Sequence, residues 1–122
     1  MRSDQVSDLI PFLHVADVER SIAFYEKLGL VVDDTYEHQG QLLWVSMRSG
    51  SAALMLNKAP EPIEPSGARY FLYTENLVGL RERLIRDGWE PAEIVDGTPG
   101  PKQEMAICDP DRHFLTIAQI GD

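Results

Sequence analysis

The amino-acid sequence predicts an α+β fold made of two βαβββ modules, and three observations carry this prediction. The first is a strand that runs directly into an amphipathic helix within residues 10–29. The second is a weaker copy of that unit fifty-nine places later, which takes Asp17 to Asn76 and Gly29 to Gly88. The third is a proline-rich stretch between the two copies. A duplicated small module indicates a site built between the copies.

The first module is predicted over about residues 8–57. A β-compatible run precedes Asp17, whose side chain is suited to cap the following helix, and Gly29 is suited to end that helix. A hairpin is expected around Gln39 and Gly40. The expected apolar face of the helix is Val18, Ile22, Tyr25 and Leu28. The expected strands cover residues 9–15, 30–38, 41–48 and 52–57.

The second module is predicted over about residues 67–120, after an extended linker at residues 58–66 that holds three prolines. Asn76 is placed to cap its helix and Gly88 to close it. The expected apolar helix positions are Leu77, Leu80, Leu84 and Ile85. The expected strands cover residues 69–74, 89–95, 104–108 and 113–120, of which 89–95 is the weakest because Pro91 interrupts it. The sequence therefore predicts one domain over residues 1–122.

Composition and charge exclude several kinds of partner. Eleven basic and twenty acidic residues give a net charge of -9, which argues against a nucleic-acid surface and favours cationic small molecules, unless the charge serves solubility alone. No apolar run approaches the roughly 20 residues that a membrane span needs. The polar N-terminus lacks the apolar core of a signal peptide, and Cys108 is the only cysteine, so we expect a cytoplasmic protein without a disulfide. Cys108 is expected to be buried.

Two strings carry a resemblance to a known family. HVADVERSIAFYEKLGL at residues 14–30 and DPDRHFLTIAQ at residues 109–119, together with the paired modules, resemble the vicinal oxygen chelate superfamily. That superfamily holds glyoxalase I, extradiol dioxygenases, fosfomycin-resistance enzymes and bleomycin-binding proteins. The resemblance implies that each sheet curves into a half-barrel cup and that the chain forms a homodimer whose pockets both chains complete. The family turn usually ends in glycine, where this chain has Arg112.

The positions that bind metal in the family's enzymes are unsuited to metal here. Aligned through the resemblance, they are Ile10, Met55, Arg69 and Thr116. Isoleucine has no lone pair, arginine stays protonated, and methionine and threonine are poor ligands for hard cations. We therefore expect no metal, no other cofactor and no catalytic residue, in the manner of the bleomycin-resistance-type, metal-free members.

The histidines leave an alternative open. His14, His38 and His113, with Glu104, are the donors from which a displaced metal site could be built. No pair of them has the spacing that is typical of a metal site, so a structural or solvent-exposed role is the simpler interpretation.

Strand alternation predicts the lining of the cup. If Ile10 faces inward, the residues two and four places along the same strand also do, and the same holds from Arg69 onward. The predicted ligand-binding residues are Phe12, His14, Trp44, Met55, Arg69, Phe71, Tyr73 and Thr116. This lining is apolar and aromatic with one fixed cation, suited to stacking and to a carboxylate or phosphate. Trp44 aligns with a tryptophan of bleomycin-binding members. The opposing interpretation is a filled core in which Arg69 pairs with Glu104.

Two classes of function follow. The first is a binding protein, of the antibiotic-resistance type, that sequesters an aromatic or cationic small molecule in a dimer groove without metal. The alternative is a glyoxalase-like lyase or isomerase, or a dioxygenase-related enzyme, with a displaced or absent metal site. A regulatory or purely structural dimer module is a third, weaker option.

Overall fold

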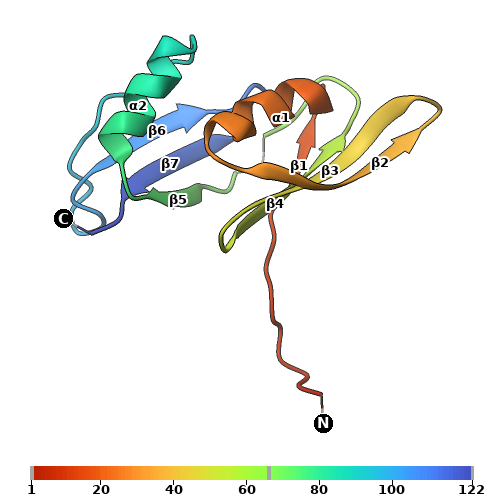
Figure 1. The fold of residues 1–122 in the computed structure, drawn as a ribbon, viewed down its shortest axis with the longest axis horizontal. Coiled ribbons are helices and arrows are strands. Elements are labelled where there is room, and N and C mark those ends of the chain that lie inside the picture. Colours follow the sequence, from red (N-terminus) through yellow and green to blue (C-terminus); the bar gives the residue numbers. More distant parts are fainter. Residues whose placement is uncertain (1, 66, 122) are drawn as a thin grey trace.

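Two β-sheets and two α-helices make up the fold, which is the predicted α+β class (Figure 1). The computed structural model describes residues 2–65 and 67–121. Ser66 of the predicted linker, and the two ends of the predicted domain, lie outside the described residues. The elements are β1 (Phe12–Val15), α1 (Val18–Lys27), β2 (Val31–His38), β3 (Gln41–Ser49), β4 (Ala52–Lys58), β5 (Tyr70–Thr74), α2 (Leu77–Arg86), β6 (Glu104–Cys108) and β7 (Phe114–Gln119).

The two helices begin and end where the sequence predicts. The Asp17 side chain accepts a hydrogen bond from the backbone N–H of Arg20 at 3.0 Å, and Asn76 does the same for Gly79 at 3.0 Å. These bonds satisfy donors that the first helical turn leaves free. Just beyond each helix, Gly29 and Gly88 adopt φ values of 98° and 92°, which glycine reaches without a steric cost.

The strand pairing repeats between the halves of the chain. The first sheet has the order β1-β4-β3-β2 and the second the order β5-β7-β6, with a parallel pair, β1 with β4 and β5 with β7, in each. Phe12 pairs with Met55, and Phe71, which lies fifty-nine places after Phe12, pairs with Thr116 in the same way. The duplication is therefore present in the backbone pairing as well as in the residue pattern.

Both helices lie on the same side of the two sheets (Figure 1). Because successive strand residues point to opposite faces, every second side chain packs under a helix and the others do not. The core under α1 is Leu13, Val15, Val45, Met47, Leu54 and Leu56, and the core of the second half contains Met105, Ile107, Leu115 and Ile117. The opposite faces carry no helix, and we call them the helix-free faces of the β1-β4-β3-β2 sheet and of the β5-β7-β6 sheet.

The prediction of a strand at residues 89–95 is wrong. Toward β6 this segment makes an isolated bridge, between Val95 and Glu104, and a hydrogen bond from the Ala92 N–H to the Ala106 carbonyl at 2.8 Å. Three residue steps, from Ala92 to Val95, lie opposite two steps of β6, from Ala106 to Glu104, so a regular ladder does not form. The second half of the chain therefore has three strands in its sheet where the first has four.

Helix α1 joins the two halves of the chain. The Phe24 ring meets the Trp89 ring edge-on, with 4.8 Å between centroids. Lys27 pairs with Asp87 at 3.3 Å, and its carbonyl accepts a hydrogen bond from Arg83 Nη2 at 2.6 Å. Phe24 lies outside the apolar face predicted for this helix and is nonetheless fully buried, because the second half covers that side of α1.

Cys108 is exposed, contrary to the prediction that it is buried. It lies at the end of β6 opposite Phe114, and its neighbour Ile107 faces the core. Alternation therefore places the thiol on the helix-free face. Among the described helices, none is both long and apolar enough to cross a membrane.

Candidate functional site

The helix-free face of the β1-β4-β3-β2 sheet carries four of the eight predicted ligand-binding residues. Strand pairing aligns Phe12 with Met55 in one row and places His14 and Trp44 on either side of Asn57 in the next. Phe12 and His14 are exposed, and their rings meet edge-on with 5.8 Å between centroids. Met55 and Trp44 are half-buried. These four side chains therefore form one continuous surface of apolar and aromatic character.

The helix-free face of the β5-β7-β6 sheet carries the other four. Phe71 pairs with Thr116, and Tyr73 lies one row further along β5. Phe71 and Tyr73 are 48% and 61% exposed, an unusual state for aromatic rings, whereas Thr116 is buried. Arg69 precedes β5, and its guanidinium carbon lies 4.7 Å from the centroid of the Phe114 ring. In the described residues, strand pairing does not join the two sheets, so the eight residues form two surfaces.

Several residues share these faces but are absent from the predicted set. Pairing with Trp44, Met55, Phe71 and their neighbours brings them there. They include Tyr36, Ser46 and Asn57 on the first sheet and Glu104, Ala106, Cys108, Phe114 and Ala118 on the second. The hairpin at Gln39 and Gly40 alone would mislead for Tyr36, because regular extension from the turn pairs Tyr36 with Leu43, and only an irregularity between Tyr36 and Glu37 brings it opposite Trp44. Phe114 lies two places before Thr116, and strand alternation alone indicated it.

The positions that hold metal in the family's enzymes do not fit a metal ion. Arg69 lies over Phe114, and a guanidinium there would repel a dication. Met55 and Phe12 pair across the first sheet, and Thr116 is buried between Phe71 and Ala106 in the second. Residues 2–65 and 67–121 contain no group of three or more His, Cys, Asp or Glu side chains that could hold an ion.

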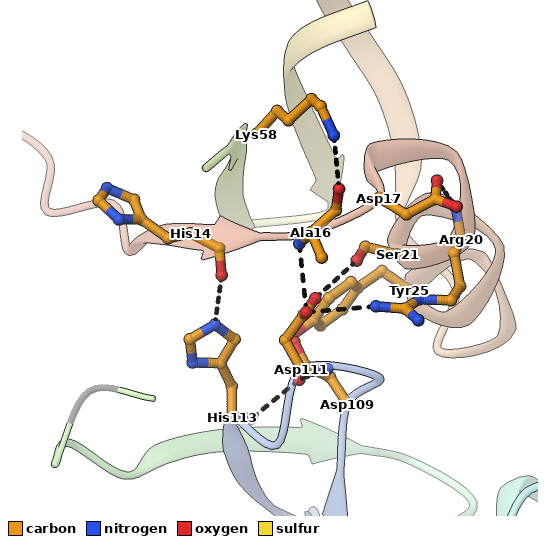
Figure 2. A network of polar contacts seen from close by, with 10 residues as sticks. All are labelled: His14, Ala16, Asp17, Arg20, Ser21, Tyr25, Lys58, Asp109, Asp111 and His113. Atoms are coloured by element: carbon orange, nitrogen blue, oxygen red, sulfur yellow. Dashed lines mark hydrogen bonds and ion pairs between the residues drawn. The ribbon is translucent and has the colours of Figure 1, made fainter. Parts of the chain in front are cut away.

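A cluster of polar side chains connects the Asp109–His113 turn to the junction of β1 and α1 (Figure 2). Asp111 Oδ1 accepts hydrogen bonds from the Ala16 N–H and from Arg20 Nη2, both at 3.2 Å, and Oδ2 accepts one from Ser21 Oγ at 3.5 Å. His113 Nε2 lies 2.8 Å from the His14 carbonyl oxygen, which can only accept, so Nε2 carries the proton. The DPD turn and His113 therefore act in the packing of the two halves, and the His14 ring points away from them on the helix-free face (Figure 2).

Asp109 organises the same turn from inside. Its Oδ1 accepts from the backbone N–H groups of Asp111 at 2.9 Å and His113 at 2.8 Å, and its Oδ2 accepts from the Tyr25 hydroxyl at 2.8 Å. Burial, with the adjacent Asp109 charge, raises the pKa of Tyr25 above its ordinary value, so the phenol keeps the proton it donates. Burial also raises the pKa of the Asp109 carboxyl, although its hydrogen bonds act in the opposite direction.

The Asp109 carboxyl gives the protein a testable pH dependence. Its pKa is higher in the folded state than in the unfolded chain, so protonation favours the folded state and this contribution is lost as the pH rises from about 3.9 through the raised folded pKa. We expect the difference in unfolding free energy, wild type minus Asp109→Asn, to decrease over that interval. Urea titrations of both proteins at a series of pH values measure it. A difference that grows with pH would show that the folded pKa is not raised.

Arg112 occupies the place where the family turn usually has glycine, and its φ is 69°. A left-handed backbone costs a non-glycine residue about 1–2 kcal/mol, whereas glycine adds about 0.4–1 kcal/mol of unfolded-state entropy. We therefore expect Arg112→Gly to raise the unfolding free energy by about 0.5–1 kcal/mol, measured by urea denaturation. Arg112→Ala is the matched control, because it removes the same side chain and keeps the strain. Equal effects of the two substitutions would show that strain is not the cause.

The surface hollows formed by the described residues include three that none of the eight predicted residues lines. One, of about 480 Å³, lies between residues 88–92 and β6, with Ala106, Cys108 and Phe114 in its wall. Another, of about 530 Å³, lies beside the DPD turn between Arg20 and Arg112, and the third, of about 400 Å³, lies near Lys58. The first adjoins the helix-free face of the β5-β7-β6 sheet through Phe114.

Comparisons with solved structures show a shared fold. The bleomycin resistance determinant encoded on the transposon Tn5 has a TM-score of 0.73 at 20% identity, over 93% of this chain and 98% of that one. A bleomycin-binding protein complexed with bleomycin has a TM-score of 0.73 at 20% identity, over 95% and 100% of the chains. A variant of the fosfomycin resistance protein FosX from Listeria monocytogenes, complexed with Mn(II) and 1S,2S-dihydroxypropylphosphonic acid, has a TM-score of 0.73 at 15% identity, over 93% and 90%.

Comparison with curated protein sequences finds no significant match. A family model, however, matches residues 4–117, which is nearly the whole chain. This match agrees with the resemblance that the sequence strings carry and with the shared fold. The chain belongs to the Glyoxalase/Bleomycin resistance protein/Dioxygenase superfamily.

Proposed function

We propose that this chain is a small-molecule-binding protein that holds an aromatic compound against its helix-free faces without a metal ion. The observation that carries the proposal is the exposure of aromatic rings on those faces, with Phe12, Phe71 and Tyr73 each about half exposed. Aromatic side chains left accessible on rigid strands offer flat surfaces on which another ring can stack. The complex of a structurally similar protein with bleomycin supports a binding role for this fold.

The proposed groove is completed by a second copy of the chain. Each helix-free face is open, and an aromatic ligand lying on one sheet alone would keep a large part of its own surface in water. Small-molecule sites usually bury most of the ligand. A second copy that places one sheet against the other sheet of its partner would enclose the ligand and cover the exposed rings. The proposed assembly is thus a homodimer of single-domain chains, each built of two related modules and acting in the cytoplasm.

The proposal excludes a metal because of the chemistry of the available donors. The family positions carry isoleucine, methionine, arginine and threonine, and Arg69 adds a positive charge to them. An enzyme of the glyoxalase or dioxygenase kind would need a donor set that the described residues do not gather.

Tryptophan fluorescence tests the binding proposal. The chain has two tryptophans, of which Trp89 packs on Phe24, so a Trp89→Phe variant reports from Trp44 on the helix-free face. We expect aromatic compounds, tested as a panel that includes bleomycin, to quench this signal, and Phe12→Ser to weaken the binding. Val78→Ser, which alters an exposed residue of α2, is the matched control. A panel that leaves both fluorescence and thermal stability unchanged would overturn the proposal.

Elemental analysis tests the proposed absence of a metal ion, and light scattering tests the proposed homodimer. We expect purified protein to hold no stoichiometric divalent metal after dialysis, and added nickel, zinc or manganese not to raise its melting temperature. One tightly bound ion per chain that Met55→Ala releases would contradict the metal-free assignment. Light scattering is expected to give the mass of a dimer, and a monomer at high micromolar concentration would count against the shared groove.

A further inference from the structure

Arg69 is held over an aromatic ring and has no acidic partner in the described part of the chain. Its guanidinium carbon lies 4.7 Å from the Phe114 ring centroid, within the range of a cation–π contact. The ion pairs between described residues are Arg20 with Asp111, Lys27 with Asp87 and Arg48 with Asp33, so Arg69 takes part in none of them. The pairing of Arg69 with Glu104, which the sequence left open, is not formed.

Glu104 is engaged elsewhere. Its backbone forms the bridge with Val95. Its side-chain carboxyl lies so close to Gly97 that a Cβ added there would fall 2.5 Å from the Glu104 Cδ atom. The carboxyl is therefore directed toward the loop that follows Val95, at the end of β6 away from Arg69. Arg69 remains the only cation among the described residues in the rows of this helix-free face, and its charge is not compensated by that glutamate.

The rows of the face place Arg69 beside the exposed ring of Phe71. Arg69 and Phe114 form one row together with Cys108, and the next row is Phe71, Thr116 and Ala106. In that second row a large exposed ring stands on β5, and short side chains follow on β7 and β6. Thr116 is buried whereas Phe71 is about half exposed, so the surface open to a flat ring in this row is the ring of Phe71. Alternate residues of a strand are about 6.6 Å apart, which is the spacing between Arg69 and Phe71. A substituent on a ring packed against Phe71 then reaches the row that contains Arg69.

A stacked guanidinium is oriented so that it can bind a planar anion. Stacking holds the group over the Phe114 ring and leaves the N–H donors at its edge available, and two of them match the two oxygens of a carboxylate. The chain as a whole carries a net charge of -9, which repels anions at long range. Salt at physiological strength screens such repulsion beyond about 8 Å, so the local cation decides which ligand is retained at contact.

We propose that Arg69, stacked on Phe114, recognises the carboxylate of an aromatic acid whose ring packs against Phe71. The proposal rests on the proposed binding function and narrows its ligand class to aromatic carboxylates. It assigns Arg69 as a specificity-determining residue and Phe114 as the residue that positions it. It also departs from the cationic ligand that the net charge alone would suggest.

A matched pair of probes tests this assignment. 2-Naphthoate and 2-naphthamide have nearly the same shape and differ in charge, and isothermal titration calorimetry gives their affinities for the intact protein. We expect the acid to bind at least about tenfold more tightly than the amide, the ratio typical of a charge-assisted hydrogen bond. Arg69→Gln is expected to abolish that preference by weakening the acid alone. Arg69→Lys keeps the charge and loses the paired donors. We expect its preference for the acid over the amide to lie between those of the wild type and of Arg69→Gln.

Two further variants separate positioning from charge. Phe114→Leu removes the ring under the guanidinium. We expect it to lower the affinity for the acid several-fold and to leave the affinity for the amide unchanged. Arg86→Gln, at an exposed position of α2, is the control for a general change of charge and is expected to alter neither affinity. Circular dichroism of each variant confirms that it is folded.

The outcomes distinguish this proposal from the one on which it rests. Equal affinities for acid and amide, preference for an aromatic cation, failure of both probes to bind, or an acid preference that survives Arg69→Gln would each overturn the assignment of Arg69. If other aromatic compounds still quench Trp44 in any of those cases, the binding function stands with a different ligand class. If no aromatic compound binds at all, both proposals fail together.

Discussion

Replacing Asp111 with alanine is expected to lower the free energy of unfolding by about 3 kcal/mol. Asp111 is 6% exposed, and its carboxylate accepts hydrogen bonds from the Ala16 N–H, from Arg20 and from Ser21. Alanine leaves these donors without an acceptor, and an unpaired buried donor costs about 1–3 kcal/mol. Since small domains are stable by only about 5–15 kcal/mol, a loss of this size is a large part of the total.

Urea denaturation measures the loss, and two variants control it. Asp33→Ala breaks an exposed ion pair with Arg48 and is expected to cost under about 1 kcal/mol. Asp111→Asn keeps an acceptor oxygen for the Ala16 N–H, so its loss of unfolding free energy is expected to lie between those of Asp33→Ala and Asp111→Ala. If Asp111→Ala were no more harmful than Asp33→Ala, the contact between the turn and the start of α1 would contribute little to stability.

Replacing Phe24 with alanine is expected to cost about 3–5 kcal/mol, the range for removing a large buried aromatic side chain. Phe24 is fully buried, and its ring meets Tyr25 and Trp89 edge-on with centroid distances of 5.0 Å and 4.8 Å. The substitution opens a cavity between α1 and the segment after α2. The two halves of the chain therefore lose a packing contact together with the buried area.

The measurement is again urea denaturation, followed through tryptophan fluorescence because Trp89 lines the cavity. Phe12→Ala makes the same chemical change at a residue that is 51% exposed, and we expect it to cost under about 1 kcal/mol. A similar cost for both substitutions would mean that the two halves do not depend on the Phe24 contact. Refolding of the Phe24→Ala protein in two separate transitions would show that this contact couples the halves.

The order of elements could be predicted from the sequence because its signals are local. Asp17 and Asn76 are caps, and Gly29 and Gly88 are stops, whose effect depends on one helical turn. The prediction of a strand at residues 89–95 was wrong for a different reason. Its alternation suggested a strand, but a strand exists only where its backbone keeps register with a neighbour, and between Ala92 and Val95 this segment has one residue more than the stretch of β6 opposite it.

The helix-free faces could also be predicted, because strand alternation has a period of two and one correct residue places the others. Arg69 fell on the expected face for this reason, whereas its partner could not be foreseen. The choice between Glu104 and Phe114 depended on strand pairing and on the direction of the loop after Val95.

The contacts of Asp109 and Asp111 with α1 were out of reach of sequence reasoning. They join groups separated by 84 to 95 positions along the chain. From the sequence, the DPD string has the form of a proline turn, and only the packing of the halves shows that its carboxylates are buried acceptors. The burial of Ser21 could not be predicted for the same reason, because its hydrogen-bond partner, Asp111, lies in the other half of the chain.

Strand β2 lies at the outer end of its sheet, and all its residues are exposed. An outermost strand with free N–H and C=O groups is a template on which strands of other molecules can add without limit, as in amyloid. Two irregularities in its pairing with β3, one after Val32 and one after Tyr36, twist this template, and Asp33, Asp34 and Glu37 place like charges along it. A second chain that adds here in register brings carboxylates against carboxylates. The like charges along β2 therefore act against stacking of this chain through its outermost strand.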